Sequence, residues 1–500
     1  MTELLSNLAL GFGVAASPIN IMFCLIGALV GTLVGVLPGI GSVATLAMLL
    51  PITFGLPPVS ALIMLAGIYY GAQYGGSTTS VLVNIPGEAT SVVTTLDGHQ
   101  MAKQGRAGAA LAIAAIGSFV AGCLATVLVA ALGAPLTSLA LLFGPAEYFS
   151  LMVLGLIFAV VLAKGSILKA LAMIVAGLML SMVGSDLETG VGRMTFDLPE
   201  LSDGMGFAVV AMGVFGFAEI IRNLEKPTSR EFVMSKISGL MPTAADLKAS
   251  APAIGRGMVI GSLLGILPGG GAVIASFAAY TFEKKISKDP SRFGRGAIEG
   301  VAAPESANNA AAQTSFIPLL TLGIPPNAVM ALMVGAMTIH GIVPGPQVMT
   351  KQPELFWGMI ASMWLGNLML IVINLPLVGV WVRLLRVPYR HLFPMIVIFC
   401  CIGIYSVNNA PFDVSMTAIW GIVGYWLVKH DFEPAPMILG FVLGPLMEEN
   451  LRRAMLIARG DATVFLTRPI SATLLGISAF MLILSLLPAI RGKRDEVFTE

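Results

Sequence analysis

The sequence predicts an all-α polytopic membrane protein with two inverted repeats, and three observations support that prediction. Of its 500 residues, 56% are hydrophobic and only 11% charged, with a mean hydropathy of +0.89, whereas about a quarter of the residues of a soluble protein are charged. Apolar stretches of roughly 20 residues recur about ten to twelve times, which is enough for as many transmembrane helices. A glycine- and proline-rich segment in the first half recurs in the second half.

Composition also excludes several classes. The net charge is +1 and there is no basic domain, so we expect no nucleic-acid partner. The four cysteines lie in apolar stretches without CxxC or metal spacing, so we expect buried thiols, no structural metal site and no cofactor. The residues concerned are Cys24, Cys123, Cys400 and Cys401.

Basic residues in short loops indicate the cytoplasmic side, because Lys and Arg resist translocation. The basic segments are Lys103 to Arg106, Lys164 to Lys169, 222–256, 283–295, Arg383 to His391 and the tail from Arg491 to Arg494. The C-terminus is therefore expected in the cytoplasm, and the acidic segment 185–203 on the outward side. The path of 429–461 is left open, because Arg452 and Arg453 lie beside a short apolar stretch.

The internal repeat is clearest in two segments. Residues 27–43 read GALVGTLVGVLPGIGSV and residues 257–273 read GMVIGSLLGILPGGGAV, with nine of 17 positions identical. Three glycines at helical spacing make a smooth face for close helix packing. The proline after them cannot continue the hydrogen-bond ladder, so each copy predicts a helix that breaks within the membrane. Packing glycines with a simple kink are the alternative.

The second copy predicts a re-entrant hairpin. Its flanks, 222–256 and 283–295, are both basic, and the roughly 26 apolar residues between them are too few to cross the bilayer twice. The first copy has uncharged flanks, which fit the outward side, so the two halves would be inverted. The expected organisation is a first half at 1–221 with a hairpin at 21–51, a cytoplasmic connector at 222–256, a second half at 257–428 with a hairpin at 257–282, and a C-terminal membrane region at 429–500.

A second broken motif follows in each half, at 75–93 and 307–333. Each has a Pro-Gly or Pro-Pro break in an apolar segment rich in Ser, Thr and Asn. Such a break exposes backbone amides and carbonyls, which lipid penalises by several kcal/mol each, so the breaks should line a wet cavity. An ordinary polar kink is the alternative for each motif.

These breaks define the expected substrate and ion site. Helix N-termini offer amides to a carboxylate, and carbonyl or hydroxyl oxygens suit Na⁺. Glu88 and Glu305 could bind Na⁺ or carry a proton, although a helix cap at Glu88 and a structural hydrogen bond at Glu305 are open alternatives. The expected site residues are Pro38, Gly39, Gly41, Ser77, Thr78, Thr79, Asn84, Pro86, Gly87, Glu88, Thr90, Pro268, Gly269, Gly270, Gly271, Glu305, Asn308, Asn309, Thr314, Gly323, Pro325, Pro326 and Asn327.

Enzymatic motifs are weak. Glu448, Glu449 and Arg453 form an EExxxR pattern that resembles the intramembrane prenyl-endopeptidase family, but the four histidines lack the flanking residues that this family requires. The chain has no HExxH, P-loop or GxSxG motif. We therefore expect no enzyme, and interpret EENLRR at 448–453 as an ion-paired helix start or a docking surface near the cytoplasmic face.

Several motifs together resemble the large membrane subunit of the tripartite tricarboxylate transporters. They are GVLPGIG at 35–41, YGGSTTSVLVNIPGEATSVVT at 74–94, PESANNAAA at 304–312, LTLGIPPNAV at 320–329 and GFVLGPLMEENLRRAM at 440–455. The resemblance implies a carrier of the bacterial inner membrane, driven by an ion gradient, that works with a small four-span membrane subunit and a periplasmic solute-binding protein. The family usually has GIPG followed by a small residue where this chain has Pro326 and Asn327.

The leading hypothesis is a cation-coupled symporter for a small carboxylate, with Na⁺ or H⁺ as the coupling ion. In this hypothesis the part that carries the hairpins moves against a fixed scaffold. A passive channel or a scaffold for partner proteins is the second hypothesis, and an intramembrane protease is the third.

Overall fold

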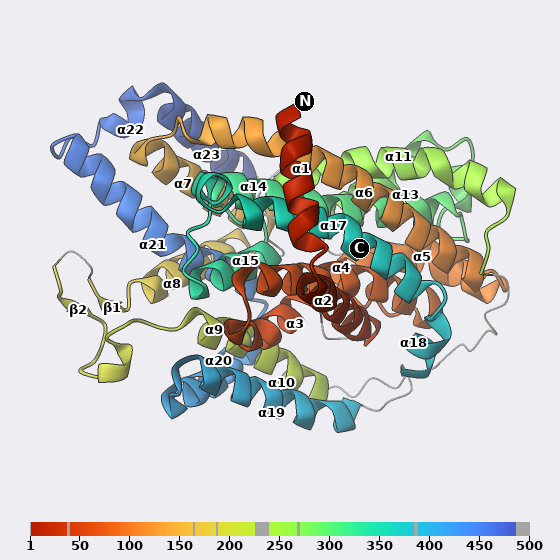
Figure 1. Cartoon of the computed structure of the whole chain (residues 1–500), viewed down its shortest axis with the longest axis horizontal. Coiled ribbons are helices and arrows are strands. Elements are labelled where there is room, and N and C mark those ends of the chain that lie inside the picture. Colours follow the sequence, from red (N-terminus) through yellow and green to blue (C-terminus); the bar gives the residue numbers. More distant parts are fainter. Residues whose placement is uncertain are drawn as a thin grey trace.

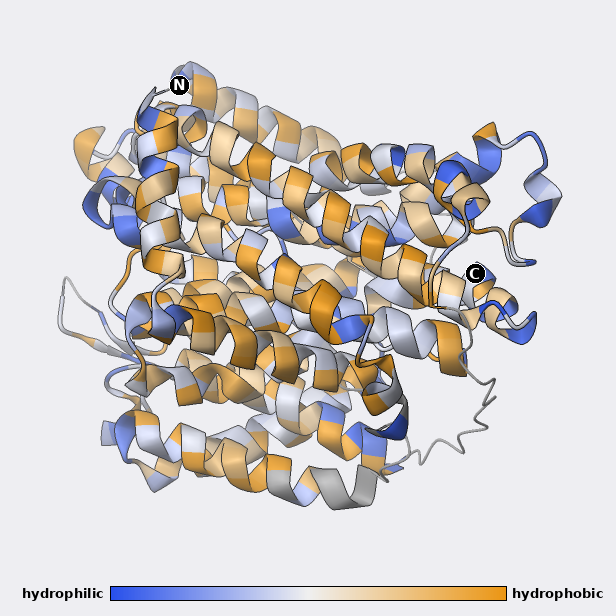
Figure 2. Ribbon diagram, turned by 45° about the vertical axis from the view of Figure 1, so that its right-hand side comes forward, coloured by the Kyte–Doolittle hydropathy of each residue, from blue (hydrophilic) through white to orange (hydrophobic). Residues whose placement is uncertain are grey.

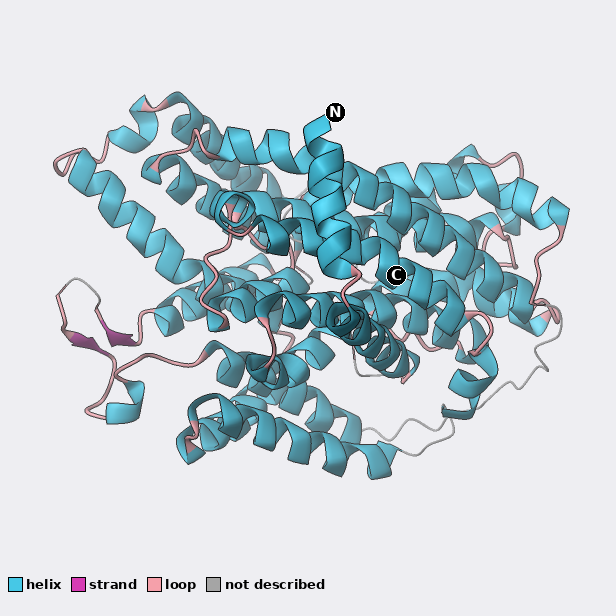
Figure 3. Cartoon of the chain, in the orientation of Figure 1, coloured by secondary structure: helices cyan, strands magenta, loops and turns pink. Residues whose placement is uncertain are grey.

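The computed structural model describes residues 2–37, 41–163, 166–186, 189–225, 240–267, 271–384 and 389–486, and within them almost every ordered element is a helix (Figure 3). A small antiparallel pair joins β1 (Gly184–Ser185) to β2 (Gly192–Arg193). The predicted all-α class is therefore confirmed.

Six of the described helices or helical runs are long and apolar enough to cross a membrane. They are α2 (Pro18–Val36), α6 (Ala107–Ala140), α7 (Pro145–Leu162), the run Phe207–Glu225, α11 (Ala244–Ile266) and α17 (Pro353–Asn374). Shorter apolar helices accompany them, and hydrophilic residues gather at helix ends and loops (Figure 2). The polytopic prediction is confirmed as well.

The two halves contain similar helices in the same order. The first half has α1 (Thr2–Ala15), α2, α3 (Ser42–Leu49), a 3₁₀ turn (Leu50–Gly55), α4 (Pro58–Val83), a second 3₁₀ turn (Ala89–Ser91) and α5 (Val92–Lys103). The second half has α11, α12 (Gly271–Ile286), α13 (Glu299–Thr314), α14 (Phe316–Leu322), α15 (Ala328–Ile339), α16 (Pro346–Lys351) and α17. The helix α6 packs between them, against α4, α11, α13 and α17.

The repeated glycines allow the same close helix packing in both halves. A Cβ on Gly27, Gly31 or Gly35 of α2 would collide with a backbone carbonyl of α4, at Met64, Ile68 and Ala72 in turn. A Cβ on Gly257, Gly261 or Gly265 of α11 would collide in the same way with α13, at Ala303, Ala307 and Ala311. Each glycine face therefore lets two helix backbones touch, as small residues do in membrane helix pairs.

The correspondence continues through the second broken motif. α4 ends at Asn84 and α14 ends at Gly323, and both residues have left-handed backbone angles, with φ of 58° and 74°. Four residues later, Glu88 and Asn327 each stand at the N-cap of the next helical turn. The two motifs, whose sequences align only loosely, therefore share the same order of backbone conformations.

The hairpin regions are broken helices. α2 ends at Val36 and α3 begins at Ser42, and α11 ends at Ile266 before α12 begins at Gly271. The tips, with the expected site residues Pro38, Gly39, Pro268, Gly269 and Gly270, lie outside the described residues. α11 starts at Ala244, so this arm includes residues that the sequence assigned to the connector. Arg256 and Glu283 join the arms by a bidentate ion pair at 2.5 and 2.8 Å.

The remaining helices surround the two halves on two sides (Figure 1). These are α7, α8 (Ile167–Ser181), α9 (Phe207–Ala211), a π-helical segment (Met212–Phe217), α10 (Ala218–Glu225), α18 (Val378–Leu384), α19 (Tyr389–Asn408), α20 (Pro411–Lys429), α21 (Pro434–Ile457), α22 (Val464–Thr467) and α23 (Pro469–Leu486). α21 packs against α7 and α8, and α20 packs against the π-helical segment. The broken half-helices α3 and α15 contact this surrounding group directly.

The EENLRR stretch is not where the sequence placed it. It lies in the C-terminal half of α21, where Glu448 pairs with Arg193 at 2.8 Å and Arg452 pairs with Asp186 at 2.7 Å. EENLRR thus lies on the same side as the 185–203 loop, which is expected outward. The expected ion pairs are present, but the expected helix start is wrong, because α21 begins at Pro434, well before this stretch.

Candidate functional site

A cavity of about 1060 Å³ lies where four helix breaks meet. Its wall takes Ser42 and Val43 from the start of α3, and 88–90 from the break after α4. The second half supplies Ala272 and Val273 from α12, and 327–329 from the start of α15. Both repeats therefore contribute the same two structural features to one space.

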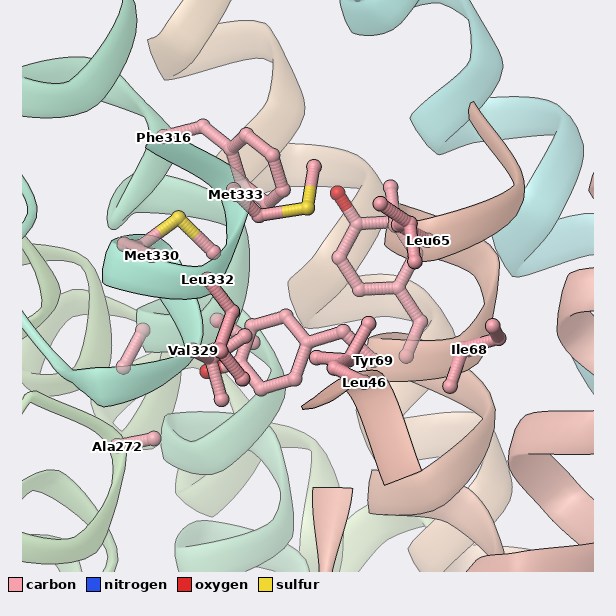
Figure 4. Packing of buried hydrophobic residues seen from close by; sticks show 14 of the residues in the cluster. Leu46, Leu65, Ile68, Tyr69, Ala272, Phe316, Val329, Met330, Leu332 and Met333 are labelled. Carbon is pink, nitrogen blue, oxygen red and sulfur yellow. The ribbon is translucent and has the colours of Figure 1, made fainter. Parts of the chain in front are cut away.

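Apolar and aromatic side chains close the cavity on its inner side. Tyr69 and Gln73 of α4 line it, together with Val329 of α15. Figure 4 shows Leu46 of α3, Tyr69 and Val329 lying close together, with Met330 and Phe316 above them in the view. This packing belongs to the large buried core of the protein.

Glu88 is the acid at the first-half end of the cavity. Its side chain lines the cavity and the residue is 8% exposed. The carboxylate accepts a hydrogen bond from the backbone N–H of Ser42, the first residue of α3, so it caps that half-helix. None of the ion pairs among the described residues includes Glu88. Glu88 also stands at the N-cap of the turn after Gly87, where the helix-cap alternative placed it, but its carboxylate caps α3, a different helix, inside the cavity.

Asn327 holds the equivalent position at the other end. Its side-chain oxygen accepts a hydrogen bond from the backbone N–H of Met330 at 2.9 Å and caps α15. The side chain is neutral, so the second-half end of the cavity carries no charge from the break. The two halves therefore line the cavity with similar backbone features, but the side chain at the break is an acid in the first half and a neutral amide in the second half.

Charged residues from the surrounding helices line the outer part of the cavity. Lys169, Arg222 and Lys429 all belong to it. Lys429 pairs with Glu225 at 2.8 Å, whereas Lys169 donates to the carbonyl of His430 at 2.7 Å.

Sequence reasoning used Lys169 and Arg222 only as topology markers and missed their place at the cavity. Their position at helix ends next to basic loops was the available signal. These residues lie on the side expected to be cytoplasmic, so the cavity reaches the surface there.

Glu305 lies away from the main cavity. It is 0% exposed, and its two carboxylate oxygens accept hydrogen bonds from Ser77 of α4, at 2.6 Å, and from Thr94 of α5. Its backbone carbonyl accepts a bond from Asn309 at 3.1 Å, and Asn309 also donates to Ser118 of α6 at 2.7 Å. Glu305 therefore joins the second half to the first through neutral hydroxyl groups.

The expected residues divide into four groups. Glu88, Thr90 and Asn327 line the main cavity, and Gly41 and Gly271 adjoin it. Several have local roles: Thr79 donates to Val36 at the end of α2, Thr314 donates to the carbonyl of Ala310, and Gly87 packs on Gly35. Asn84, Gly323, Pro86, Pro325 and Pro326 shape the breaks, Asn84 being exposed. Ser77, Thr78, Glu305, Asn308 and Asn309 belong to a separate buried polar region.

The described residues include no group of three or more His, Cys, Asp or Glu side chains that could hold a transition metal. The EExxxR acids also face neither cavity, and both are in ion pairs, Glu448 with Arg193 and Glu449 with Arg453.

Comparisons with known proteins agree with this architecture. Residues 21–439 match the family described as the tripartite tricarboxylate transporter TctA family. The chain is 59% identical, over the full length of both proteins, to an uncharacterized 52.8 kDa protein of Agrobacterium vitis from the TAR-I region 3′ of ttuC′. It is 67% identical over 240 residues, 48% of this chain and 99% of the relative, to an uncharacterized protein from the TAR-II region of the same organism. No solved structure matches the chain.

Proposed function

Since the chain belongs to the tripartite tricarboxylate transporter TctA family, whose members are the large membrane subunits of tripartite systems, we propose that it carries a small carboxylate across the bacterial inner membrane. The energy comes from a gradient of Na⁺ or H⁺. The partners are a small four-span membrane subunit and a periplasmic solute-binding protein, and the C-terminus lies in the cytoplasm.

The observation that carries this proposal is the meeting of four helix breaks at one cavity. Interrupted helices are tolerated in membranes where they line a wet cavity, because backbone groups freed by the break need partners. In secondary transporters such breaks bind the substrate and its coupling ion near the bilayer centre. The cavity has room for a molecule of several carboxylates and its water.

The charge asymmetry indicates how a carboxylate lies in this cavity. At the first-half end, Glu88 already places a carboxylate on the N-terminus of α3. A second carboxylate there would meet a like charge. At the second-half end, Asn327 is neutral, and α15 begins beside it with the positive end of its dipole. We therefore assign the carboxylate of the substrate to the Asn327 end.

The surrounding helices fit the role of a scaffold. The half-helices α3 and α15 contact them directly, whereas the glycine faces pack α2 tightly on α4 and α11 tightly on α13. Sliding of these pairs along the scaffold would carry the cavity from one side to the other. Lys169, Arg222 and Lys429 then lie on the cytoplasmic exit path.

Uptake into proteoliposomes tests the proposal. The chain is reconstituted with its partner subunits, and labelled citrate and dicarboxylates are offered with an inward Na⁺ gradient, with a pH gradient, and with neither. We expect uptake against the concentration gradient with at least one of the two ion gradients. Uptake that only equilibrates the label, whatever the ion gradient, would instead identify a passive channel.

A further inference from the structure

A second, much smaller cavity lies between α4, α6 and α17. Its volume is about 10 Å³, which is close to the space that one water-sized particle needs. Polar side chains contribute oxygen atoms from three helices. They are Tyr74, Ser77 and Thr78 of α4, Ser118 of α6 and Asn374 of α17. The rest of the wall is Leu111, Ala114 and Ala115.

Two of these oxygens have no hydrogen-bond partner among the described residues. They are the hydroxyl of Tyr74 and the side-chain carbonyl of Asn374, and the two residues are 3% and 6% exposed. The amide nitrogen of Asn374 donates to the carbonyl of Leu370 at 2.9 Å, which leaves its oxygen for the cavity. Leaving a buried polar atom without a partner costs about 1–3 kcal/mol, so a species in the cavity that contacts both atoms would stabilise the fold.

A buried ionisable acid, Glu305, lies next to this cavity. Ser77 lines the cavity and donates to the carboxylate of Glu305 at 2.6 Å. Glu305 is fully buried, and none of the ion pairs of the described residues includes it. Asp97 offers a contrast, because its carboxylate is satisfied by three backbone N–H groups and the hydroxyl of Tyr280. Glu305 has only two hydroxyl donors, so a counter-charge nearby would stabilise it.

We propose that the small cavity binds one Na⁺, held by the oxygens of Tyr74, Ser77, Thr78, Ser118 and Asn374, with Glu305 as the neighbouring negative charge. Five neutral oxygens around a particle of this size form the type of shell that a hard cation takes. The proposal rests on the proposed function, for which it names the coupling ion and its place.

The position of this site explains how the ion could act on the substrate. The helix α4 separates the two cavities: Tyr69 and Gln73 face the larger one, whereas Tyr74 and Ser77 face the smaller one. A cation shared by α4, α6 and α17 fixes the C-terminal turns of α4. These turns lead directly to the break that carries Glu88. Ion binding would thus order the wall of the substrate cavity.

The test measures thermal unfolding of the purified full chain in detergent, in NaCl, KCl or choline chloride at equal ionic strength. We expect NaCl to raise the Tm and the other salts not to. Tyr74→Phe removes one ligand oxygen and should raise the half-saturating Na⁺ concentration about tenfold, and Glu305→Gln should abolish the Na⁺ effect. Tyr70→Phe is the matched control, since this hydroxyl is also buried on α4 without a partner but does not line the cavity.

The site is wrong if the wild type shows no specific response to Na⁺, or if Tyr74→Phe responds as Tyr70→Phe does. Thr78→Val replaces Tyr74→Phe if that variant does not fold. Carboxylate uptake that follows a pH gradient and ignores Na⁺ would overturn this site and leave the proposed function intact. A specific Na⁺ response in a chain that moves no carboxylate would support this site and overturn the proposed function.

Discussion

Asn327→Asp is expected to lower carboxylate uptake about a hundredfold. The new carboxylate stands at the end of the cavity that we assign to the carboxylate of the substrate. Two like charges about 5 Å apart repel by about 3 kcal/mol at an effective dielectric constant of 20. Asp is as good an N-cap as Asn, so the hydrogen bond to the N–H of Met330 and the fold should remain. Initial rates of labelled uptake into proteoliposomes measure the effect.

Gln352→Glu is the control for this change. Gln352 is an exposed residue at the N-cap of α17, away from the cavity, so the variant adds the same charge at a helix N-terminus outside the site. Its uptake should match the wild type. Equal uptake by Asn327→Asp and Gln352→Glu would show that the substrate does not bind at the Asn327 end.

Gly261→Ala is expected to lower the free energy of unfolding by about 2–3 kcal/mol, because overpacking in a close contact costs energy of this size. A Cβ at this position would collide with the backbone carbonyl of Ala307, so α11 and α13 would have to separate. The backbone of α13 cannot yield as a flexible side chain could. Thermal unfolding in detergent, followed by circular dichroism, measures the loss.

Gly255→Ala on the same helix is the matched control. A Cβ at Gly255 meets nothing within 4 Å, so the variant should keep the wild-type stability or gain up to about 1 kcal/mol from the better helix propensity of Ala. If both variants unfold at the same temperature, the glycine face of α11 is not a packing surface.

Much of the fold could be predicted from the sequence, because helix breaks and close helix packing depend on glycine and proline residues. The spacing of Gly257, Gly261 and Gly265 indicated a smooth helix face, and the structure shows α13 packed on it. Composition alone indicated a polytopic helical protein, and the six long apolar helices confirm this. The sequence alone could not match Asn84, which ends α4, with Gly323, which ends α14. The two residues are of different types but adopt the same left-handed backbone conformation.

The site was only partly predictable, since tertiary contacts decide which polar groups meet. Glu88 and Glu305 looked alike as acids beside helix breaks. In the structure, Glu88 lines the large cavity and Glu305 lies against Ser77 and Thr94 outside it. The charges at Lys169 and Arg222 come from helices that follow in the chain and approach the breaks only in the fold. A local sequence pattern does not indicate which helices lie next to the breaks in the folded protein.

The place of EENLRR within its helix was missed for a related reason. The stretch was interpreted as a helix start, whereas it lies in the C-terminal half of α21. Arg193, Glu448 and Arg452 instead form an ion-paired group with Asp186, which neutralises the charge that the positive-inside rule counts. Partnered charges are a weak guide to topology.

Cysteine protection can show directly whether the four helix breaks line one substrate cavity. Single cysteines replace Val43, Ala89, Val273 and Ala328, one at each break, in a chain whose native cysteines are changed to alanine. A control cysteine replaces Leu142, an exposed residue in the turn between α6 and α7. The rate of reaction with a charged, water-soluble thiol reagent is measured with and without the transported carboxylate. We expect the substrate to slow the reaction at all four breaks and to leave the control unchanged. If the four cysteines react at the same rate with and without substrate, the breaks do not line the substrate site.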